Sequence, residues 1–179
     1  MRDRIPVRLP VQANTLEDLR SGDMVSLTGR IYGARDAAHK RLVEAIDAGQ
    51  QLPIDLNNQT IYYVGPAPAR AGHVIGPAGP TTSGRMDVYT VPLLQLGVKV
   101  LIGKGYRARE VKEALLEHRS VYLAAVGGAA ALLARHITAS KVIAYEDLGP
   151  EAIHELMIAD FPCIVVHDIY GGDAYTRQD

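Results

Sequence analysis

The loop at residues 76–85 carries the residue types best suited to binding an anion. Three glycines and two prolines in these ten residues exclude a regular helix or strand, because proline lacks a backbone N–H and glycine is conformationally free. Thr81, Thr82 and Ser83 supply hydroxyls, and Arg85 stands where an apolar pattern typical of a helix begins. Such a combination at a helix start suits an anion. The alternative is a turn in which Ser83 caps the helix that follows.

Two further cations lie where the sequence predicts that other strands end. Arg35 stands between a predicted strand and a predicted helix, and Lys104 stands between two glycines after an apolar run. Ligands of open α/β sheets gather at such strand ends. If Arg35, Arg85 and Lys104 converge, their charges suit a small dianion such as a dicarboxylate. Taken singly, each is more simply interpreted as a solvated surface cation, although the glycines beside Lys104 would let a ligand approach closely.

Other reactive groups have simpler interpretations. His39 could carry a proton, but its place in a helical turn beside two basic residues favours a capping or surface role, and Asp36 is predicted to cap the same helix. Cys163 lies in an apolar run, which predicts a buried side chain rather than a nucleophile. One cysteine cannot form an internal disulfide or hold a zinc ion or an iron–sulfur cluster, so no metal ligands are expected in this chain. The glycine and lysine spacing at 97–104 does not fit a phosphate-binding loop, and no dinucleotide-binding fingerprint is present.

Composition places the chain among single-domain globular proteins. Its 179 residues are 47% hydrophobic, which is enough to build a core, and 19 basic and 20 acidic residues leave a formal net charge of −1. That balance gives no general attraction to nucleic acid or to an anionic membrane. The N-terminus lacks the apolar core of a signal peptide, and no apolar run approaches the ~20 residues of a membrane-spanning helix. A cytoplasmic protein is therefore expected.

The order of the predicted elements indicates a layered α/β fold. Strands are expected at 5–11, 24–32, 53–56, 60–64, 98–102, 121–126, 141–145 and 163–167, and helices at 36–48, from about 84, and at 109–118, 129–136 and 151–157. Strands dominate the first half, and strands and helices alternate in the second. This order predicts a largely parallel sheet with extra β structure near the N-terminus. The segment at 65–80, with four glycines and four prolines, is expected to be a functional loop.

Several segments together resemble one family. They are Gly-Ala-Arg-Asp-Ala-Ala-His-Lys-Arg at 33–41, Gly-Pro-Thr-Thr-Ser-Gly-Arg-Met-Asp at 79–87, Gly-Lys-Gly at 103–105, Val-Gly-Gly-Ala-Ala-Ala-Leu at 126–132, Glu-Asp-Leu-Gly-Pro-Glu-Ala-Ile at 146–153 and Asp-Phe-Pro at 160–162. In this order they resemble the class I fumarase and tartrate dehydratase family. The resemblance covers nearly the whole chain, taken as one domain at 1–179. It matches the family's C-terminal domain, which is a separate beta subunit in two-subunit members.

The resemblance implies a fold, a partner and a reaction. The implied fold is a swivelling β/β/α domain, and the implied partner is an alpha subunit that holds a [4Fe-4S] cluster in an (αβ)2 hetero-oligomer. The implied reaction is the reversible dehydration of L-malate to fumarate, for which this chain alone is expected to be inactive. Tartrate dehydratase remains an alternative, because the same cations would serve either C4 dicarboxylate. A non-catalytic carboxylate-binding domain is an alternative from a different class of function.

The resemblance also implies roles for particular residues. The expected ligands of the substrate carboxylates are Arg35, Arg85 and Lys104. Thr81 is similar to the threonine proposed in the family as the catalytic base, and a simple anion binder would not need its hydroxyl. The residues expected to support these groups without contacting the substrate are Asp36, His39, Thr82 and Ser83.

Overall fold

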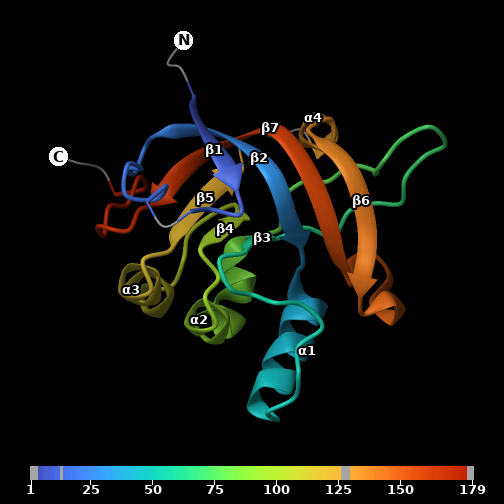
Figure 1. Cartoon of the computed structure of the whole chain (residues 1–179), viewed down its shortest axis with the longest axis horizontal. Helices are drawn as coiled ribbons and strands as arrows, with labels where there is room; N and C mark the ends of the chain where they lie inside the picture. Colours follow the sequence, from blue (N-terminus) through green and yellow to red (C-terminus); the bar gives the residue numbers. More distant parts are fainter. Residues whose placement is uncertain (1–3, 13, 126–129, 177–179) are drawn as a thin grey trace.

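Seven strands form one sheet in the part of the chain that the structure, a computed structural model, describes: residues 4–12, 14–125 and 130–176. The strands are β1 (Ile5–Leu9), β2 (Met24–Gly33), β3 (Thr60–Tyr62), β4 (Val100–Gly103), β5 (Val121–Ala125), β6 (Ile137–Ala144) and β7 (Ile153–His167). The helices are α1 (Asp36–Asp47), α2 (Asp87–Gln95), α3 (Arg109–Glu117) and α4 (Ala130–Ala134), with 3₁₀ turns η1 (Ser83–Met86) and η2 (Glu146–Glu151). Figure 1 shows α1, α2 and α3 gathered on one side of β3, β4 and β5, with the long strands β2 and β7 on the other.

The strands β1 to β5 run parallel to one another. β1 pairs with β2, β2 with β3, β3 with β4, and β4 with β5. The predicted parallel sheet is confirmed for these strands, and β1 supplies the β structure expected near the N-terminus. Because they point the same way, the residues that follow β2, β3, β4 and β5 all emerge at one edge of the sheet.

The longest strand, β7, runs antiparallel to three neighbours, which are β2, β5 and β6. Since β2 leads through β3, β4 and β5 back to β7, these five strands close into a ring. The sheet is therefore mixed, and its antiparallel part goes beyond what the sequence predicted.

The predicted helix at 151–157 is wrong. From Ile153 the chain belongs to β7, where Leu156 and Ile158 are buried and Met157 between them is 40% exposed. That alternation has the period of a strand, and pairing with β2 and β6 satisfies the backbone on both sides. The strand expected at 163–167 is the second half of the same element, after Asp160 at φ 51°.

Two other sequence predictions need correction. The segment at 53–56 is irregular rather than a strand, and the Asn57 N–H donates to Asp55 Oδ1 at 2.9 Å, which begins a turn instead of a ladder. The helix expected at 129–136 is the shorter α4, and β6 begins at Ile137 rather than at residue 141. Residues 126–129, which belong to one of the family-like segments, lie outside the described residues.

Two hydrophobic cores lie on the two faces of the parallel strands. Along each strand successive side chains point to opposite faces, so Tyr62 enters one core and Tyr63 the other. The first core lies between the parallel strands and the antiparallel part, and Phe161 of β7 packs on Tyr62 there, with ring centroids 5.3 Å apart. The second core lies under α1, α2 and α3. Burial on both faces explains why β4 and β5 are continuous apolar runs.

None of the described helices has both the length and the apolar character that a membrane crossing requires.

Candidate functional site

The predicted site residues lie at the carboxyl ends of the parallel strands. Arg35 follows β2 after one intervening residue, and Lys104 follows β4 directly. The long loop that leaves β3 ends at Thr81, whose N–H donates to the carbonyl of Tyr63 at 2.7 Å. This bond returns the loop to the end of the strand from which it started. Three neighbouring strands therefore bring Arg35, Thr81 and Lys104 to one edge of the sheet.

Asp36 joins the two arginines of the site. Arg35 Nε lies 3.2 Å from Asp36 Oδ2, and Arg85 Nε and Nη2 each lie 2.9 Å from Asp36 Oδ1. Glu151 Oε1 also lies 3.2 Å from Arg35 Nε. The two arginines are balanced by these two carboxylates, and Lys104 at the end of the neighbouring strand β4 adds one positive charge to the same edge of the sheet. Arg85 is the more open of the two arginines, with its side chain 54% exposed.

The prediction that Asp36 caps α1 is wrong. Asp36 is the first residue of the helix, and its carboxylate binds the two arginines instead. The carboxylate of Glu151 accepts a hydrogen bond from the Ala37 N–H at 3.3 Å and so caps the first turn of the helix in place of Asp36. The same carboxylate therefore serves both the helix and Arg35.

The absence of a side chain at Gly65 lets the Arg35 side chain pack directly against the backbone at that residue. A Cβ atom at Gly65, just after β3, would lie 2.6 Å from Arg35 Cδ. Any side chain at position 65 would displace the guanidinium from the edge of the sheet. The start of the long loop thus helps to fix the arginine on the neighbouring strand.

The three hydroxyl residues of the loop have different environments. Thr81 is half-buried, whereas Thr82 is exposed and forms a parallel bridge with Lys104. Ser83 is fully buried. The prediction that Ser83 is a helix cap is wrong, because its Oγ lies 2.8 Å from the hydroxyl of Tyr122 and accepts from the Lys104 N–H at 3.0 Å.

His39 is fully buried, so of the two simpler roles that the sequence favoured, capping or surface, the surface role is wrong. Its Nδ1 lies 2.9 Å from the Arg35 carbonyl, and its ring meets that of Tyr63 edge-on at 5.3 Å. Burial lowers the pKa of His39 to about 4, so the ring is neutral at neutral pH. A carbonyl can only accept, which puts the proton on Nδ1. His39 therefore supports the backbone at Arg35 and is closed to direct contact with a ligand.

Sequence reasoning missed a buried cation behind the loop. The side chain of Arg107 is completely buried, with Nε 2.7 Å from Asp87 Oδ1 and Nη2 donating to Thr90 Oγ1 at 2.9 Å. Its guanidinium lies 5.2 Å from the ring centroid of Tyr63 and 4.9 Å from that of Tyr122. Arginine in an irregular segment is exposed by default, and only the presence of Asp87 twenty residues earlier hinted at a partner.

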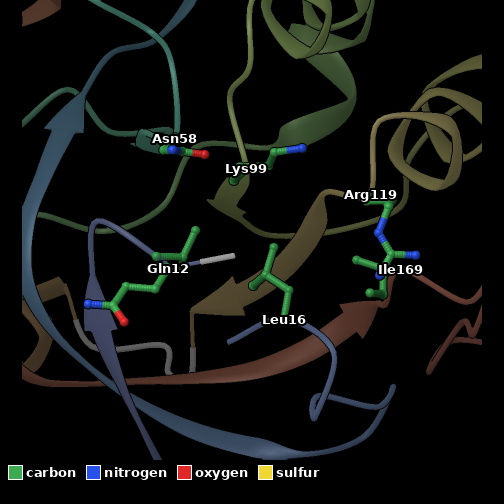
Figure 2. Close-up of a pocket in the computed structure, with 7 residues that line it drawn as sticks. Gln12, Leu16, Asn58, Lys99, Arg119 and Ile169 are labelled. Atoms are coloured by element: carbon green, nitrogen blue, oxygen red, sulfur yellow. The ribbon is translucent and has the colours of Figure 1, made fainter. Parts of the chain in front are cut away.

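A hollow of about 200 Å³ lies at the opposite end of the parallel strands (Figure 2). Asn58, Lys99 and Arg119 line it, and they precede β3, β4 and β5 respectively. Both cations there have structural partners. Lys99 Nζ donates to the carbonyl of His118 at the end of α3 at 2.5 Å, and Arg119 Nη2 pairs with Glu17 at 3.1 Å. This hollow is separate from the edge where the predicted site residues meet.

No group of three or more metal-ligating side chains lies within the described ranges. Cys163 is fully buried in β7, and burial raises the pKa of its thiol. The predicted buried role of this cysteine is confirmed. A thiol in this setting is neither accessible nor ionised, which does not suit ligation of an iron–sulfur cluster.

The chain is similar to fumarate hydratases and to a tartrate dehydratase subunit. It is 44% identical over 156 residues to "Fumarate hydratase class I, anaerobic" of Escherichia coli, which covers 86% of this chain and 28% of that protein. It is 40% identical over 159 residues to "Fumarate hydratase 2" of Leishmania major, with 87% and 28% covered. This chain thus spans less than a third of those relatives. A Methanocaldococcus jannaschii protein provisionally named as L(+)-tartrate dehydratase subunit beta is 38% identical over 168 residues, 90% of this chain and 86% of that one.

A family model extends the similarity over nearly the whole chain. The model described as "Fumarase C-terminus" matches residues 2–178. The segments that carry the resemblance in the sequence lie within this match, including those that hold Arg35, Thr81, Arg85 and Lys104. The chain belongs to the fumarase C-terminus family.

Proposed function

We propose that this chain is the dicarboxylate-binding subunit of a hydro-lyase that interconverts L-malate and fumarate. The observation that carries the proposal is the meeting of Arg35, Arg85, Lys104 and Thr81 at the carboxyl ends of neighbouring parallel strands. Dehydration of a C4 dicarboxylate needs cations that bind its two carboxylates and a group that accepts one carbon-bound proton. The similarity to the E. coli fumarate hydratase supports the same reaction.

The cations of this chain hold and polarise the substrate. Asp36 occupies only part of each guanidinium, since an arginine has five N–H donors, and the remaining hydrogens can bind a carboxylate. Lys104 is exposed and offers its three N–H donors from the neighbouring strand. Loss of the carbon-bound proton places negative charge on the adjacent carboxylate. Fixed cations stabilise that charge by about 3 kcal/mol for each well-placed donor.

Thr81 is the candidate for the proton transfer. Its backbone is fixed to Tyr63, and its side chain is half-buried at the edge of the sheet. A free hydroxyl is a very weak base, so this role requires a neighbouring base that takes the hydroxyl proton as the carbon-bound proton moves to Thr81 Oγ1. Arg85 and Lys104 would favour the ionised hydroxyl.

A second chain completes the site in this proposal. Arg85 and Lys104 lie open, and the apolar side chains of Val88 and Tyr106, close to them in sequence, are 77% and 72% exposed. Exposed apolar surface beside a charged site is typical of a protein interface. We assign this surface to an alpha subunit in an (αβ)2 hetero-oligomer, with this chain as its swivelling β/β/α domain. The [4Fe-4S] cluster that the family resemblance implies belongs to that subunit, because Cys163 does not suit ligation.

L-tartrate dehydratase is the second candidate function. The M. jannaschii relative matches this chain over 86% of its own length, whereas the fumarate hydratases are more than three times as long. The provisional name of that relative, L(+)-tartrate dehydratase subunit beta, supports tartrate as the alternative substrate. The extra hydroxyl of tartrate would then be recognised by groups that the four residues above do not include.

Anaerobic reconstitution with the cluster-bearing chain tests both candidates. The assay measures turnover of L-malate, fumarate and both tartrate enantiomers by the complex and by each chain alone. Turnover of malate and fumarate by the complex supports the fumarase assignment, and turnover of tartrate moves the assignment to tartrate dehydratase. A stable complex that binds dicarboxylates without turnover would identify a carboxylate-binding domain instead.

A further inference from the structure

Ser83 contacts both backbone groups of Lys104. The Ser83 N–H donates to the Lys104 carbonyl at 2.9 Å, and the Lys104 N–H donates to Ser83 Oγ at 3.0 Å. These contacts join the loop that follows β3 to the turn that follows β4. A Cβ atom at Gly103 would overlap Ser83 Oγ and lie 2.8 Å from the ring of Tyr63, so the glycine before Lys104 makes room for the serine.

Tyr122 extends this contact to the far side of the turn. Its hydroxyl lies 2.8 Å from Ser83 Oγ and donates to the Gly105 carbonyl at 2.9 Å. A tyrosine hydroxyl has one proton, so Ser83 must donate its own proton to the Tyr122 oxygen. The chain of donors then runs from the Lys104 N–H through Ser83 and Tyr122 to Gly105. We call the two side-chain hydroxyls of Ser83 and Tyr122 the hydroxyl clamp.

The hydroxyl clamp rests on rigid surroundings. Both of its side chains are fully buried, and the ring of Tyr122 contacts the guanidinium of Arg107 at 4.9 Å and stacks with the ring of His167 at 5.7 Å. Burial raises the pKa of Tyr122, so its hydroxyl keeps its proton at all physiological pH values. The orientation of the clamp is therefore stable.

We propose that Ser83 and Tyr122 are positioning residues, whose hydroxyl clamp sets the place of Lys104 relative to Thr81 and Arg85. The proposal rests on the proposed function, in which Lys104 binds a substrate carboxylate. The ammonium group of Lys104 lies at the end of a flexible, exposed side chain. The position of the Lys104 backbone therefore determines where the ammonium group can bind. A turn that contains Gly105 at φ 83° has few restraints of its own, and the clamp supplies them from η1, which holds Ser83, and from β5, which holds Tyr122.

Kinetics of Ser83→Ala and Tyr122→Phe in the complete enzyme test this role. Each variant should raise the KM for the dicarboxylate about tenfold with a smaller change in kcat, because a misplaced Lys104 weakens carboxylate binding. Ser120→Ala is the matched control. Ser120 is also a fully buried serine, and its Oγ donates to the Val98 carbonyl at 2.8 Å, next to the amino ends of β4 and β5. This control should lower stability similarly and leave KM unchanged.

Amide hydrogen exchange of the full chain tests the clamp without any activity. Ser83→Ala should speed exchange of the Lys104 N–H at least tenfold while leaving the Val121 N–H, which donates to the Lys99 carbonyl, at its wild-type rate. Unchanged exchange at Lys104 would overturn the clamp itself. If Ser83→Ala speeds exchange of the Lys104 N–H but has the same KM as the Ser120→Ala control, the positioning role of the clamp is overturned. A wild-type complex that turns over no hydroxydicarboxylate would remove the proposed function, and the exchange result would still decide whether the clamp exists.

Discussion

Removal of Arg85 should separate catalysis from stability. Arg85 gives Nε and Nη2 to Asp36 Oδ1, each at 2.9 Å, and keeps its remaining N–H groups for a carboxylate. A well-placed donor that meets developing charge is worth about 3 kcal/mol, which corresponds to roughly a hundredfold in rate. The ion pair with Asp36 is half exposed and should contribute less than about 1 kcal/mol to folding. Arg85→Ala should therefore lower kcat/KM roughly a hundredfold with little change in thermal stability.

The matched control is Arg41→Ala, which removes another arginine from a carboxylate pair. Arg41 Nη1 and Nη2 lie 2.8 Å from the two oxygens of Asp147, which is an exposed pair of the same kind. Steady-state kinetics of the reconstituted enzyme, with unfolding curves for each variant, should show near wild-type kcat/KM for this control. Arg85→Ala leaves Asp36 with Arg35 as its remaining partner and a less neutralised carboxylate beside the substrate, so adding Asp36→Asn should recover several-fold in KM. A near-normal kcat/KM for Arg85→Ala, or an equal loss in the control, would refute the assignment of Arg85 to the site.

Three further changes test other parts of the interpretation. Thr81→Ala should lower kcat at least a hundredfold and leave KM within about twofold. Equal effects of Thr81→Ala on kcat and KM would argue against a proton-transfer role. Because folding lowers the pKa of His39 from 6.5 to about 4, the unfolded chain binds the extra proton first. The free energy of unfolding should therefore fall as pH drops from 6.5 to 4, by on the order of 3 kcal/mol, and denaturant titrations of His39→Gln should lack that part of the slope. Val88→Asp should weaken assembly with the cluster-bearing chain at least tenfold by sedimentation analysis, whereas Leu116→Asp, on an exposed position of α3, should not.

The strand ends were predictable because burial on both faces leaves a strong local signal. The continuous apolar run of β4 marks the strand before Lys104, and the alternation of Val25, Leu27 and Ile31 with polar residues marks the strand before Arg35. A charged residue at or just after the end of such a strand is then placed at the edge of the sheet by geometry alone. That reasoning placed both residues correctly without knowledge of the other strands.

The buried polar residues were not predictable in the same way. Ser83, His39 and Arg107 all look like surface or capping residues in sequence, because polar side chains are exposed unless partners compensate for burial. Their partners come from distant segments: Tyr122 for Ser83, and Asp87 for Arg107. The helix predicted at 151–157 failed for a related reason, since long-range strand pairing rather than local pattern determines β7.

These contacts divide the candidate site into a fixed half and an open half. Lys104 is held at both backbone groups by a buried serine, whereas Arg85 is held at its exposed guanidinium by Asp36. A carboxylate of the substrate can compete with Asp36 for hydrogens of Arg85, but it cannot compete with Ser83 for the backbone of Lys104. Closure by a second chain should therefore act mainly on the arginine half, where removal of water strengthens the ion pairs. It follows that variants of Asp36 and Arg85 should change both the affinity for the second chain and the affinity for the dicarboxylate. Variants of the hydroxyl clamp should change the affinity for the dicarboxylate alone.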